Sequence, residues 1–237
     1  RNISIIVGTL FFTLGIFGVL QNFGNWDKYL GIENQTLVKK YSKNIFLRNF
    51  LREEIFGGQL KLWKFFNHKK DLKFLNMPKH GNQIGATIDG NFVVIGSFSN
   101  QFYAEILSKY LSRNKKNIMM DVGGGYGKLG YYMMKNNQNL TFIDFDIPET
   151  LVLASFYLSK CFPNKKNLFY GEKDLDEKVL DEYDLIFLPP WEIENIGKDK
   201  IDLAINKNSL GEMEPDVANN YIEHIHKTSR FFFSMNH

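Results

Sequence analysis

The sequence predicts an α/β fold in which a mostly parallel sheet carries helices on both faces. Three observations predict it. From residue 117 onwards, short apolar runs alternate with longer amphipathic segments, a glycine-rich turn follows the first apolar run, and the second apolar run ends in two acids. Such alternation is typical of parallel strands, because each crossover helix returns the chain to the same edge of the sheet.

The composition fits one globular domain of this type. The chain has 237 residues, of which 44% are hydrophobic and 23% charged, enough for one α/β core with a helical extension. Its 29 basic and 26 acidic residues give a net charge of +3, which does not indicate a nucleic-acid partner. The single cysteine, Cys161, excludes an intrachain disulfide and the common cysteine-rich zinc sites, so we expect a reducing, cytoplasmic compartment.

The first apolar run, residues 3–20, contains no charged side chain. About 18 such residues are enough to span a bilayer, so we expect an apolar helix over residues 1–24 that is a candidate membrane anchor. More basic residues follow the run than precede it, which would leave the rest of the chain on the inner, cytoplasmic face. A buried amphipathic helix or a signal-like segment is the alternative. Because the sequence begins at Arg1 and stops after a strand-like run, we treat it as a candidate fragment.

Residues 25–99 form the second expected region. Apolar side chains at helical spacing over residues 35–75, interrupted at Gly57-Gly58, predict a helical lead-in. Asp89-Gly90 is a turn signal between two short apolar runs and predicts a small hairpin. A helix over residues 100–111 then begins the third region, residues 100–237.

The third region alternates regularly between the two kinds of element. Strands are predicted over residues 118–122, 140–145, 168–170, 184–188, 201–206 and 230–235, and helices over 128–135, 149–161, 175–180 and 215–228. Open sheets of this kind bind ligands at the carboxyl ends of their strands. We therefore expect the functional residues in the turns that follow these strands.

The turn after the first strand predicts a cofactor site. It reads Asp121-Val122-Gly123-Gly124-Gly125-Tyr126-Gly127 and leads into a helix near Lys128. Glycines let the backbone turn sharply and approach a ligand closely, and the helix start offers free N–H groups. A carboxylate at Asp121 would repel a pyrophosphate but suits a cationic cofactor with an amino-acid moiety. This favours S-adenosylmethionine over a dinucleotide.

The second strand ends in Asp144-Phe145-Asp146-Ile147-Pro148, about 20 residues after the glycine turn, where a ribose-binding carboxylate is expected. We choose Asp146 for the ribose diol, with Ile147 beside the adenine. Asp144 remains a second candidate, because both acids can share one side. The alternative is that an acid only caps the helix that starts at Pro148.

A dinucleotide site is the competing interpretation. Residues Gly125 to Gly130 also satisfy the glycine fingerprint of dinucleotide-binding domains, with Asp144 close to the expected distance. On this interpretation the protein would be an NAD(P)-dependent oxidoreductase. A third interpretation is a non-catalytic domain that serves assembly.

The strand over residues 201–206 runs into Asn208-Ser209-Leu210-Gly211-Glu212-Met213. This motif, the glycine turn after Asp121 and the Asp146-Ile147-Pro148 strand end resemble class I S-adenosylmethionine-dependent methyltransferases. More narrowly, they resemble the sugar O-methyltransferases of bacterial polysaccharide biosynthesis, over residues 80–237. Two features depart from that family: Asp121 stands where it more often has Glu, and the C-terminal hairpin of the usual Rossmann-like sheet is absent.

The resemblance implies an O-methyltransferase that acts on a sugar hydroxyl of a glycan or glycolipid precursor. The glycines and Tyr126 would surround the methionine part of the cofactor, Asp121 would support the turn, and Asp146 would hold the ribose. Asn206, at the end of the strand predicted over residues 201–206, is a further candidate for contact with the cofactor.

Candidate catalytic residues lie close to the carboxyl edge of the sheet. Methyl transfer to a hydroxyl needs a base that removes its proton, and Glu212 and His237 are the candidates, with His80 less well placed. The alternative for Glu212 is a charge at the entry of the following helix. No metal is predicted, since His224 and His226 are spaced i, i+2 rather than i, i+4 on their helix.

Three residues are candidates for contact with the acceptor. Asn208 and Ser209 can bind sugar hydroxyls. Trp191, after Pro189-Pro190, offers a flat apolar face for a sugar or a purine, or else packs in the core behind a rigid turn.

Overall fold

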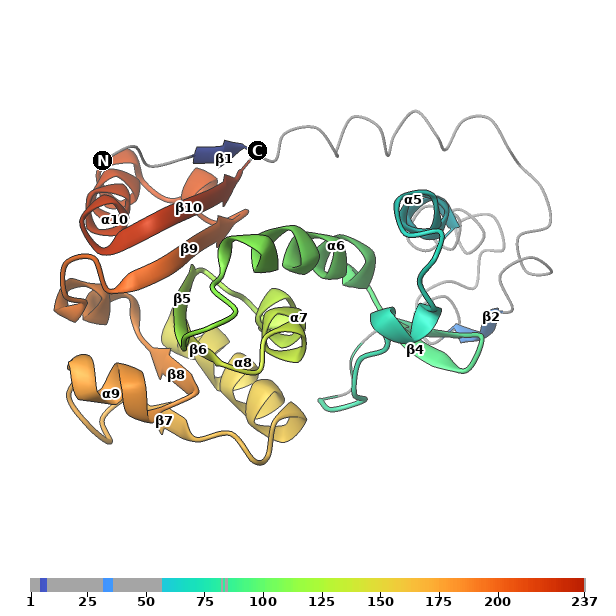
Figure 1. The fold of residues 1–237 in the computed structure, drawn as a ribbon, viewed down its shortest axis with the longest axis horizontal. Coiled ribbons are helices and arrows are strands. Elements are labelled where there is room, and N and C mark those ends of the chain that lie inside the picture. Colours follow the sequence, from blue (N-terminus) through green and yellow to red (C-terminus); the bar gives the residue numbers. More distant parts are fainter. Residues whose placement is uncertain (1–4, 8–31, 36–56, 82, 84, 237) are drawn as a thin grey trace. The chain divides into compact units, whose positions relative to one another are not determined.

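The computed structural model describes residues 5–7, 32–35, 57–81, 83 and 85–236. The chain divides into two compact units (Figure 1). The larger unit contains residues 1–8 and 104–237, and the smaller one contains residues 9–103.

A seven-stranded sheet with the order β1-β10-β9-β5-β6-β8-β7 forms the centre of the larger unit. Its strands are β1 (Ile5–Val7), β5 (Asn117–Val122), β6 (Leu140–Phe145), β7 (Asn167–Phe169), β8 (Leu185–Leu188), β9 (Ile201–Lys207) and β10 (Ser229–Met235). Every neighbouring pair is parallel. The predicted Rossmann-like α/β class is therefore confirmed.

Strand β5 marks the point where the strand order reverses. After β5 the chain builds the sheet in one direction through β6, β8 and β7, and then returns to the other side of β5 with β9 and β10. Ligands of open α/β sheets bind outside the carboxyl ends of the strands at such a reversal. The turns after β5 and β9 both lie there.

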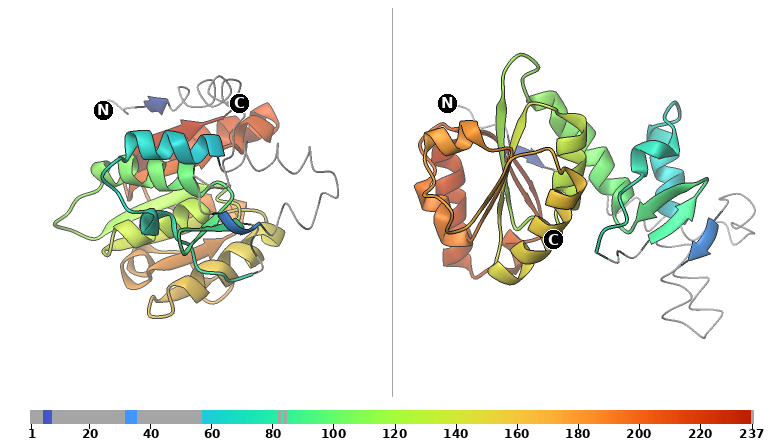
Figure 2. Two further views of the ribbon diagram at one scale, coloured as in Figure 1. Left: turned by 90° about the vertical axis from the view of Figure 1, so that its right-hand side faces the viewer. Right: turned by 90° about the horizontal axis from the view of Figure 1, so that it is seen from below.

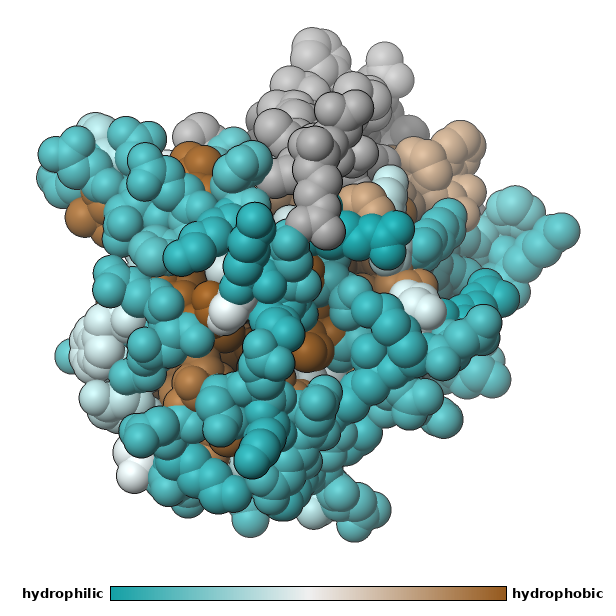
Figure 3. All heavy atoms as spheres, turned by 60° about the vertical axis from the view of Figure 1, so that its left-hand side comes forward, coloured by the Kyte–Doolittle hydropathy of each residue, from teal (hydrophilic) through white to brown (hydrophobic). Residues whose placement is uncertain are grey.

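Helices cover both faces of this sheet (Figure 2). The helices α7 (Lys128–Asn136) and α8 (Pro148–Cys161) lie on one face, and α9 (Glu177–Glu182) and α10 (Pro215–Thr228) lie on the other. On the α9 and α10 face, a core cluster joins Val179 and Leu180 of α9 and Tyr221 and Ile225 of α10 to the sheet. The outer face shown in Figure 3 is largely hydrophilic, with hydrophobic side chains visible only between polar ones.

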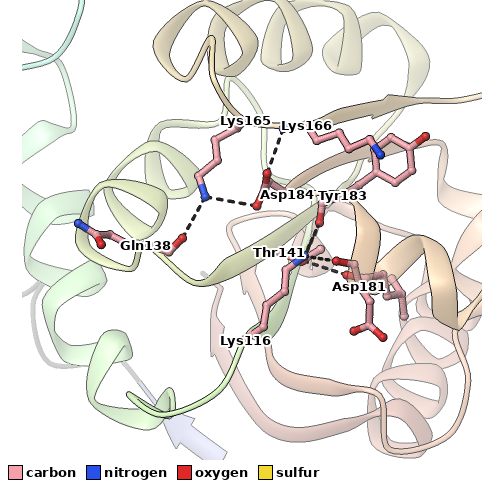
Figure 4. A network of polar contacts seen from close by, with 9 residues as sticks. Lys116, Gln138, Thr141, Lys165, Lys166, Asp181, Tyr183 and Asp184 are labelled. Carbon is pink, nitrogen blue, oxygen red and sulfur yellow. Dashed lines mark hydrogen bonds and ion pairs between the residues drawn. The ribbon is translucent and has the colours of Figure 1, made fainter.

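A polar network closes the amino-terminal edge of the sheet (Figure 4). The hydroxyl of Thr141, fully buried on β6, donates to the carbonyl oxygens of Leu180 at 3.0 Å and Tyr183 at 2.8 Å. The ammonium of Lys116 donates to the carbonyls of Asp181 and Tyr183. These contacts hold the α9–β8 connection against β5 and β6, at the edge opposite the glycine turn.

The smaller unit contains an antiparallel sheet and short helices. The sheet has the order β2 (Ile32–Gln35), β3 (Gly85–Ile88) and β4 (Asn91–Val94), beside α5 (Gln59–Phe66) and the 3₁₀ turn η2 (Leu72–Leu75). Asp89 and Gly90, with φ angles of 46° and 75°, form the tight turn between β3 and β4. The helix α6 (Ser97–Leu107) begins in this unit and leads, through η3 (Ser108–Tyr110), into the larger one.

The amino-terminal prediction needs a correction where the structure describes it. Over Ile5–Val7 the chain is not helical: it forms β1 and pairs in parallel with β10. The rest of the apolar run, residues 8–20 and residues 3–4, lies outside the described residues. Among the helices that the described ranges contain, none has the length and apolarity to cross a bilayer.

Candidate functional site

The glycine turn connects β5 to α7 at the carboxyl edge of the sheet. Gly123, Gly125 and Gly127 have φ angles of 77°, 63° and 78°, the left-handed conformation that side chains with a Cβ disfavour. The N–H of Gly123 donates to the carbonyl of Phe145 at 2.7 Å, which ties the turn to the end of β6. Gly127 is the N-cap of α7. The sequence pattern and the backbone therefore agree at this turn.

The four glycines of the turn have different surroundings. A Cβ on Gly123 would lie 2.2 Å from Oγ of Ser209, and a Cβ on Gly124 would lie 2.5 Å from Oδ1 of Asp144. A Cβ on Gly125, in contrast, would meet no atom within 4 Å. Gly123 and Gly124 are thus closely packed against neighbouring side chains. The space next to Gly125 is open, so a ligand can approach the backbone there.

Two acids lie buried directly beneath this turn. Asp121 of β5 and Asp144 of β6 are paired in register, with exposed fractions of 2% and 0%. Oδ1 of Asp121 and both carboxylate oxygens of Asp144 are buried without a hydrogen-bond partner of ordinary geometry. A buried charge without a partner is costly, so this pair needs either protons or a cationic ligand.

The electrostatics of the pair follow from this burial. Burial raises the pKa of Asp121 to about 7, with a smaller lowering effect from Lys207 and a raising effect from Asp146. Burial raises the pKa of Asp144 well above its ordinary value, and the charges of Asp121 and Asp146 raise it further, while the backbone N–H of Gly124 opposes this. Ionising either carboxyl group is therefore less favourable than for an exposed acid, and a nearby cation would offset this.

Asp146 has a different role from its neighbour Asp144. Its Oδ2 accepts a hydrogen bond from the N–H of Gly125 at 2.8 Å, and its Oδ1 accepts one from the N–H of Ile147 at 2.8 Å. Ile147, not an acid, is the N-cap of α8, with Pro148 as the first helical residue and 53% of the Ile147 side chain exposed. The helix-cap explanation for these acids is therefore wrong. The carboxylate of Asp146 stands at the open side of the turn.

Asn206 and Ser209 hold the end of β9 against the end of β5. Nδ2 of Asn206, which is fully buried, donates to the carbonyl of Val122 at 2.7 Å and also to Oγ of Ser209. The Ser209 hydroxyl donates to the same carbonyl at 2.9 Å. The sequence predicted that Asn206 contacts the cofactor and Ser209 the acceptor. In the structure both side chains form hydrogen bonds within the protein.

The other predicted acceptor and catalytic residues lie around this edge. Asn208 has a φ of 61°, and its Oδ1 is buried without a partner. Glu212 ends the 3₁₀ turn η5 (Leu210–Glu212) and is exposed. Trp191 is 55% exposed, and its indole N–H reaches the hydroxyl of Tyr170 at 3.4 Å, so it is not a core residue. His237 lies outside the described residues.

Tyr126 of the glycine turn packs against α8. Its ring lies 4.9 Å from the ring of Tyr157, between centroids. Tyr126 therefore fixes the turn against α8 at one side of the site.

One charged residue of this edge was missed by the sequence interpretation. Lys207, the last residue of β9, is half-buried. Burial lowers the pKa of its ammonium, and the charge of Asp121 opposes this. A lysine directly after an apolar strand end was the available signal.

No cluster of three or more histidine, cysteine or acidic side chains fit for a metal occurs in the described part of the chain. Asp121 and Asp144 lie together, but no third side chain of these types completes a metal site with them in the described residues. The site is therefore described by its acids, its lysine and the glycine backbone.

No model of a protein family matches the chain, and no curated protein matches it. Among the solved structures that are similar to it is the mitomycin 7-O-methyltransferase (14% identity, TM-score 0.36, covering 56% of this chain and 35% of that one). Another is a TehB-like S-adenosylmethionine-dependent methyltransferase from Corynebacterium glutamicum (16% identity, TM-score 0.36, covering 53% of this chain and 55% of that one). The magnesium protoporphyrin IX methyltransferase from Synechocystis with bound S-adenosylmethionine is also similar (14% identity, TM-score 0.38, covering 55% of this chain and 54% of that one).

The chain spans about a third of the first of these proteins and slightly more than half of the other two. Because all three TM-scores are below 0.5, the fold assignment rests on the strand order of the sheet. None of the three proteins is named for a sugar or polysaccharide acceptor.

Proposed function

We propose that the chain is a methyltransferase that binds S-adenosylmethionine at the carboxyl ends of β5, β6 and β9. The observation that carries this proposal is the buried pair Asp121 and Asp144 beneath the glycine turn, with three carboxylate oxygens that have no hydrogen-bond partner of ordinary geometry in the described part of the chain. Such a pair favours a cationic ligand and disfavours a pyrophosphate.

The residues present fit this cofactor. Gly125 is open to a ligand, and the carboxylate of Asp146 stands beside it. A carboxylate at this position, just beyond the carboxyl end of β6, is suited to a ribose diol. Ile147, exposed next to Asp146, offers an apolar surface to a purine. Asp121 would hold the ammonium of the methionine part.

When bound, S-adenosylmethionine supplies a methyl group on a positively charged sulfur. The chain's own task is to position an acceptor hydroxyl and to take its proton. Glu212, exposed just beyond the end of β9, is our candidate for the base that receives this proton. Asn208, whose buried Oδ1 has no partner, is our candidate for a hydrogen bond with the acceptor.

We further propose a sugar hydroxyl of a glycan or glycolipid precursor as the acceptor. Trp191 and Tyr170 form an exposed aromatic pair, with ring centroids 6.0 Å apart, and flat aromatic faces are suited to sugar rings. The resemblance of the strand-end motifs to sugar O-methyltransferases points to the same acceptor class.

Calorimetry with two ligands tests the cofactor. We expect S-adenosylhomocysteine to bind and NAD⁺ not to bind. Binding of NAD⁺ alone would replace the proposal by the oxidoreductase interpretation. Binding of S-adenosylhomocysteine without transfer of labelled methyl groups to any glycan extract would support the non-catalytic interpretation.

The role of Glu212 is tested by Glu212→Gln, with Glu214→Gln as the matched control. Both acids are exposed and lie in the same connection. We expect the Glu212 variant to keep its affinity for S-adenosylhomocysteine and to lose methyl transfer by roughly 10²-fold or more. Equal transfer rates in the two variants would remove Glu212 from the mechanism.

A further inference from the structure

Lys207 lies on the same face of the sheet as the buried acid pair. In the parallel register, Asp144 is opposite Asp121, and Asp121 is opposite Ile205 of β9. Because side chains alternate along a strand, Lys207, two residues beyond Ile205, points to the same face as these acids. Lys207 lies two residues closer than Ile205 to the carboxyl edge of the sheet, where we propose the ligand site.

The ammonium of Lys207 is half-buried at the end of β9. In the described residues it forms neither an ion pair nor a hydrogen bond with a side chain, although the exposed Lys115 and the half-buried Lys200 both pair with nearby acids. Asp121 is within electrostatic range of Lys207 but does not form an ion pair with it. A desolvated ammonium of this kind is stabilised by an anion.

A second positive charge lies close by. Lys128, the first residue of α7, is half-buried, and the charges of Lys128 and Lys207 act on each other, which lowers the pKa of Lys128 beyond the effect of its burial. An anion between the end of β9 and the start of α7 would relieve this repulsion, and the helix N-terminus adds a favourable field. The edge therefore carries positive charge beside the negative charge of the acid pair.

We propose that Lys207 binds the α-carboxylate of the methionine part of the cofactor, while Asp121 binds its α-ammonium. The proposal rests on the proposed function and adds to it the residue that recognises the carboxylate. Asp121 and Lys207 lie on neighbouring strands and do not form an ion pair with each other. Their opposite charges match the α-ammonium and the α-carboxylate of one amino-acid group. The alternative is that Lys207 only offsets the charge of Asp121 and never contacts a ligand.

Two ligands separate these alternatives. S-adenosylhomocysteine carries the amino-acid group, and 5′-methylthioadenosine has the same adenine, ribose and thioether without it. We would measure the Kd of both by calorimetry for the wild-type chain, Lys207→Met and Lys207→Arg. Lys200→Met is the control, since it removes one half-buried lysine immediately before the other end of β9, where Lys200 pairs with the exposed Glu177.

We expect Lys207→Met to weaken S-adenosylhomocysteine binding about tenfold or more, as for the loss of a charged hydrogen bond, and to change 5′-methylthioadenosine binding less than about twofold. Lys207→Arg should bind S-adenosylhomocysteine within about threefold of wild type, because it keeps the charge. The control should change neither Kd. An equal loss for both ligands, or no loss for either, would overturn the proposal.

A change in the ligand gives a second test of the same contact. We expect the carboxamide analogue of S-adenosylhomocysteine to bind the wild-type chain about tenfold more weakly than the acid, and the two to bind Lys207→Met equally. A wild-type chain that does not distinguish acid from carboxamide would overturn the role of Lys207 and leave the cofactor proposal intact. A wild-type chain that binds neither S-adenosylhomocysteine nor 5′-methylthioadenosine would instead overturn the cofactor proposal itself, and Lys207 with it.

Discussion

The carboxylate of Asp146 joins the end of β6 to the glycine turn, because its Oδ2 accepts a hydrogen bond from the N–H of Gly125 at 2.8 Å. The two residues belong to different strand ends and lie 21 positions apart in the sequence. The same contact fixes the only glycine of the turn whose Cβ position is open and the acid best placed for a ribose. Asp146 therefore shapes the site as well as lining it.

We expect Asp146→Ala to weaken S-adenosylhomocysteine binding by about tenfold or more, since it removes both the proposed ribose contact and the bond that orders Gly125. Asp146→Asn keeps an acceptor oxygen and should lose less affinity. The measurement is calorimetry, with Glu149→Gln, an exposed acid in the first turn of α8, as the control. Unchanged affinity in a folded Asp146→Ala variant would remove the ribose assignment.

The packing of Gly123 predicts a stability difference between two glycine positions. Gly123 and Gly171 both have positive φ angles, 77° and 87°, so alanine strains the backbone at each by about 1 to 2 kcal/mol. Only at Gly123 does the new Cβ also meet another atom, Oγ of Ser209, at 2.2 Å. We expect Gly123→Ala to lower the free energy of unfolding clearly more than Gly171→Ala, measured by urea denaturation. Equal losses would show that the turn has room at Gly123.

The sequence predicted the elements of the larger unit well, because their signals are local. Apolar runs that end in glycines or acids located β5 and β6, and an apolar run before Asn208 located β9. Pro215 marked the start of α10, which the structure has at Pro215–Thr228. The helix predicted over residues 175–180 begins later, at Glu177, because Asp176 caps it by accepting a hydrogen bond from the N–H of Val179. The spacing of apolar residues does not show which residue caps a helix, so it does not fix the first helical residue.

The roles of individual side chains were harder to predict, because they depend on partners distant in sequence. Asn206 and Ser209 both bond the carbonyl of Val122, more than 80 residues earlier in the chain, and nothing in the local pattern indicates this. Asp144 and Asp146 are two residues apart, yet one is buried under Gly124 and the other is bonded to Gly125. The interest of Lys207 depends on the register that places Ile205, two residues before it, opposite Asp121.

The amide of Asn206 predicts a large loss of stability on truncation. Its Nδ2 donates to Val122, and its Oδ1 accepts from the N–H of Leu210 at 3.2 Å and from Nδ2 of Asn236 at 2.9 Å. Asn206→Ala removes the acceptor of the buried Leu210 N–H, while the Val122 carbonyl keeps Ser209 and Nδ2 of Asn236 keeps Ser234. It should lower the free energy of unfolding by about 1 to 3 kcal/mol. Ser209→Ala should cost less, since Asn206 still satisfies the Val122 carbonyl.

Denaturant titrations of the wild type and both variants measure these differences. If Asn206→Ala were as stable as the wild type, the network would have no part in holding the β5 and β9 ends together. In that case Asn206 would be free for the cofactor contact that the sequence predicts.

The buried acid pair predicts how the stability of the ligand-free chain depends on pH. The pKa of Asp121 is raised from 3.8 to about 7 by burial, so the folded state binds this proton more tightly than the unfolded state. The resulting stabilisation is fully present below about pH 4 and is lost as the pH rises through about 7, a loss on the order of 4 kcal/mol for Asp121 alone. Asp144, with its pKa raised in the same direction, adds to the effect.

We therefore expect Asp144→Asn to flatten the decline of unfolding free energy between pH 5 and pH 8, and to be more stable than the wild type at pH 8, because it removes one of two coupled buried charges. Urea denaturation at both pH values measures this, with the exposed Asp174→Asn as the control. Saturating S-adenosylmethionine should flatten the wild-type profile as well, since its ammonium replaces the proton as the partner of the pair. A wild-type stability that rises from pH 5 to pH 8, with Asp144→Asn following the same curve, would show that these carboxylates are charged and satisfied without any ligand.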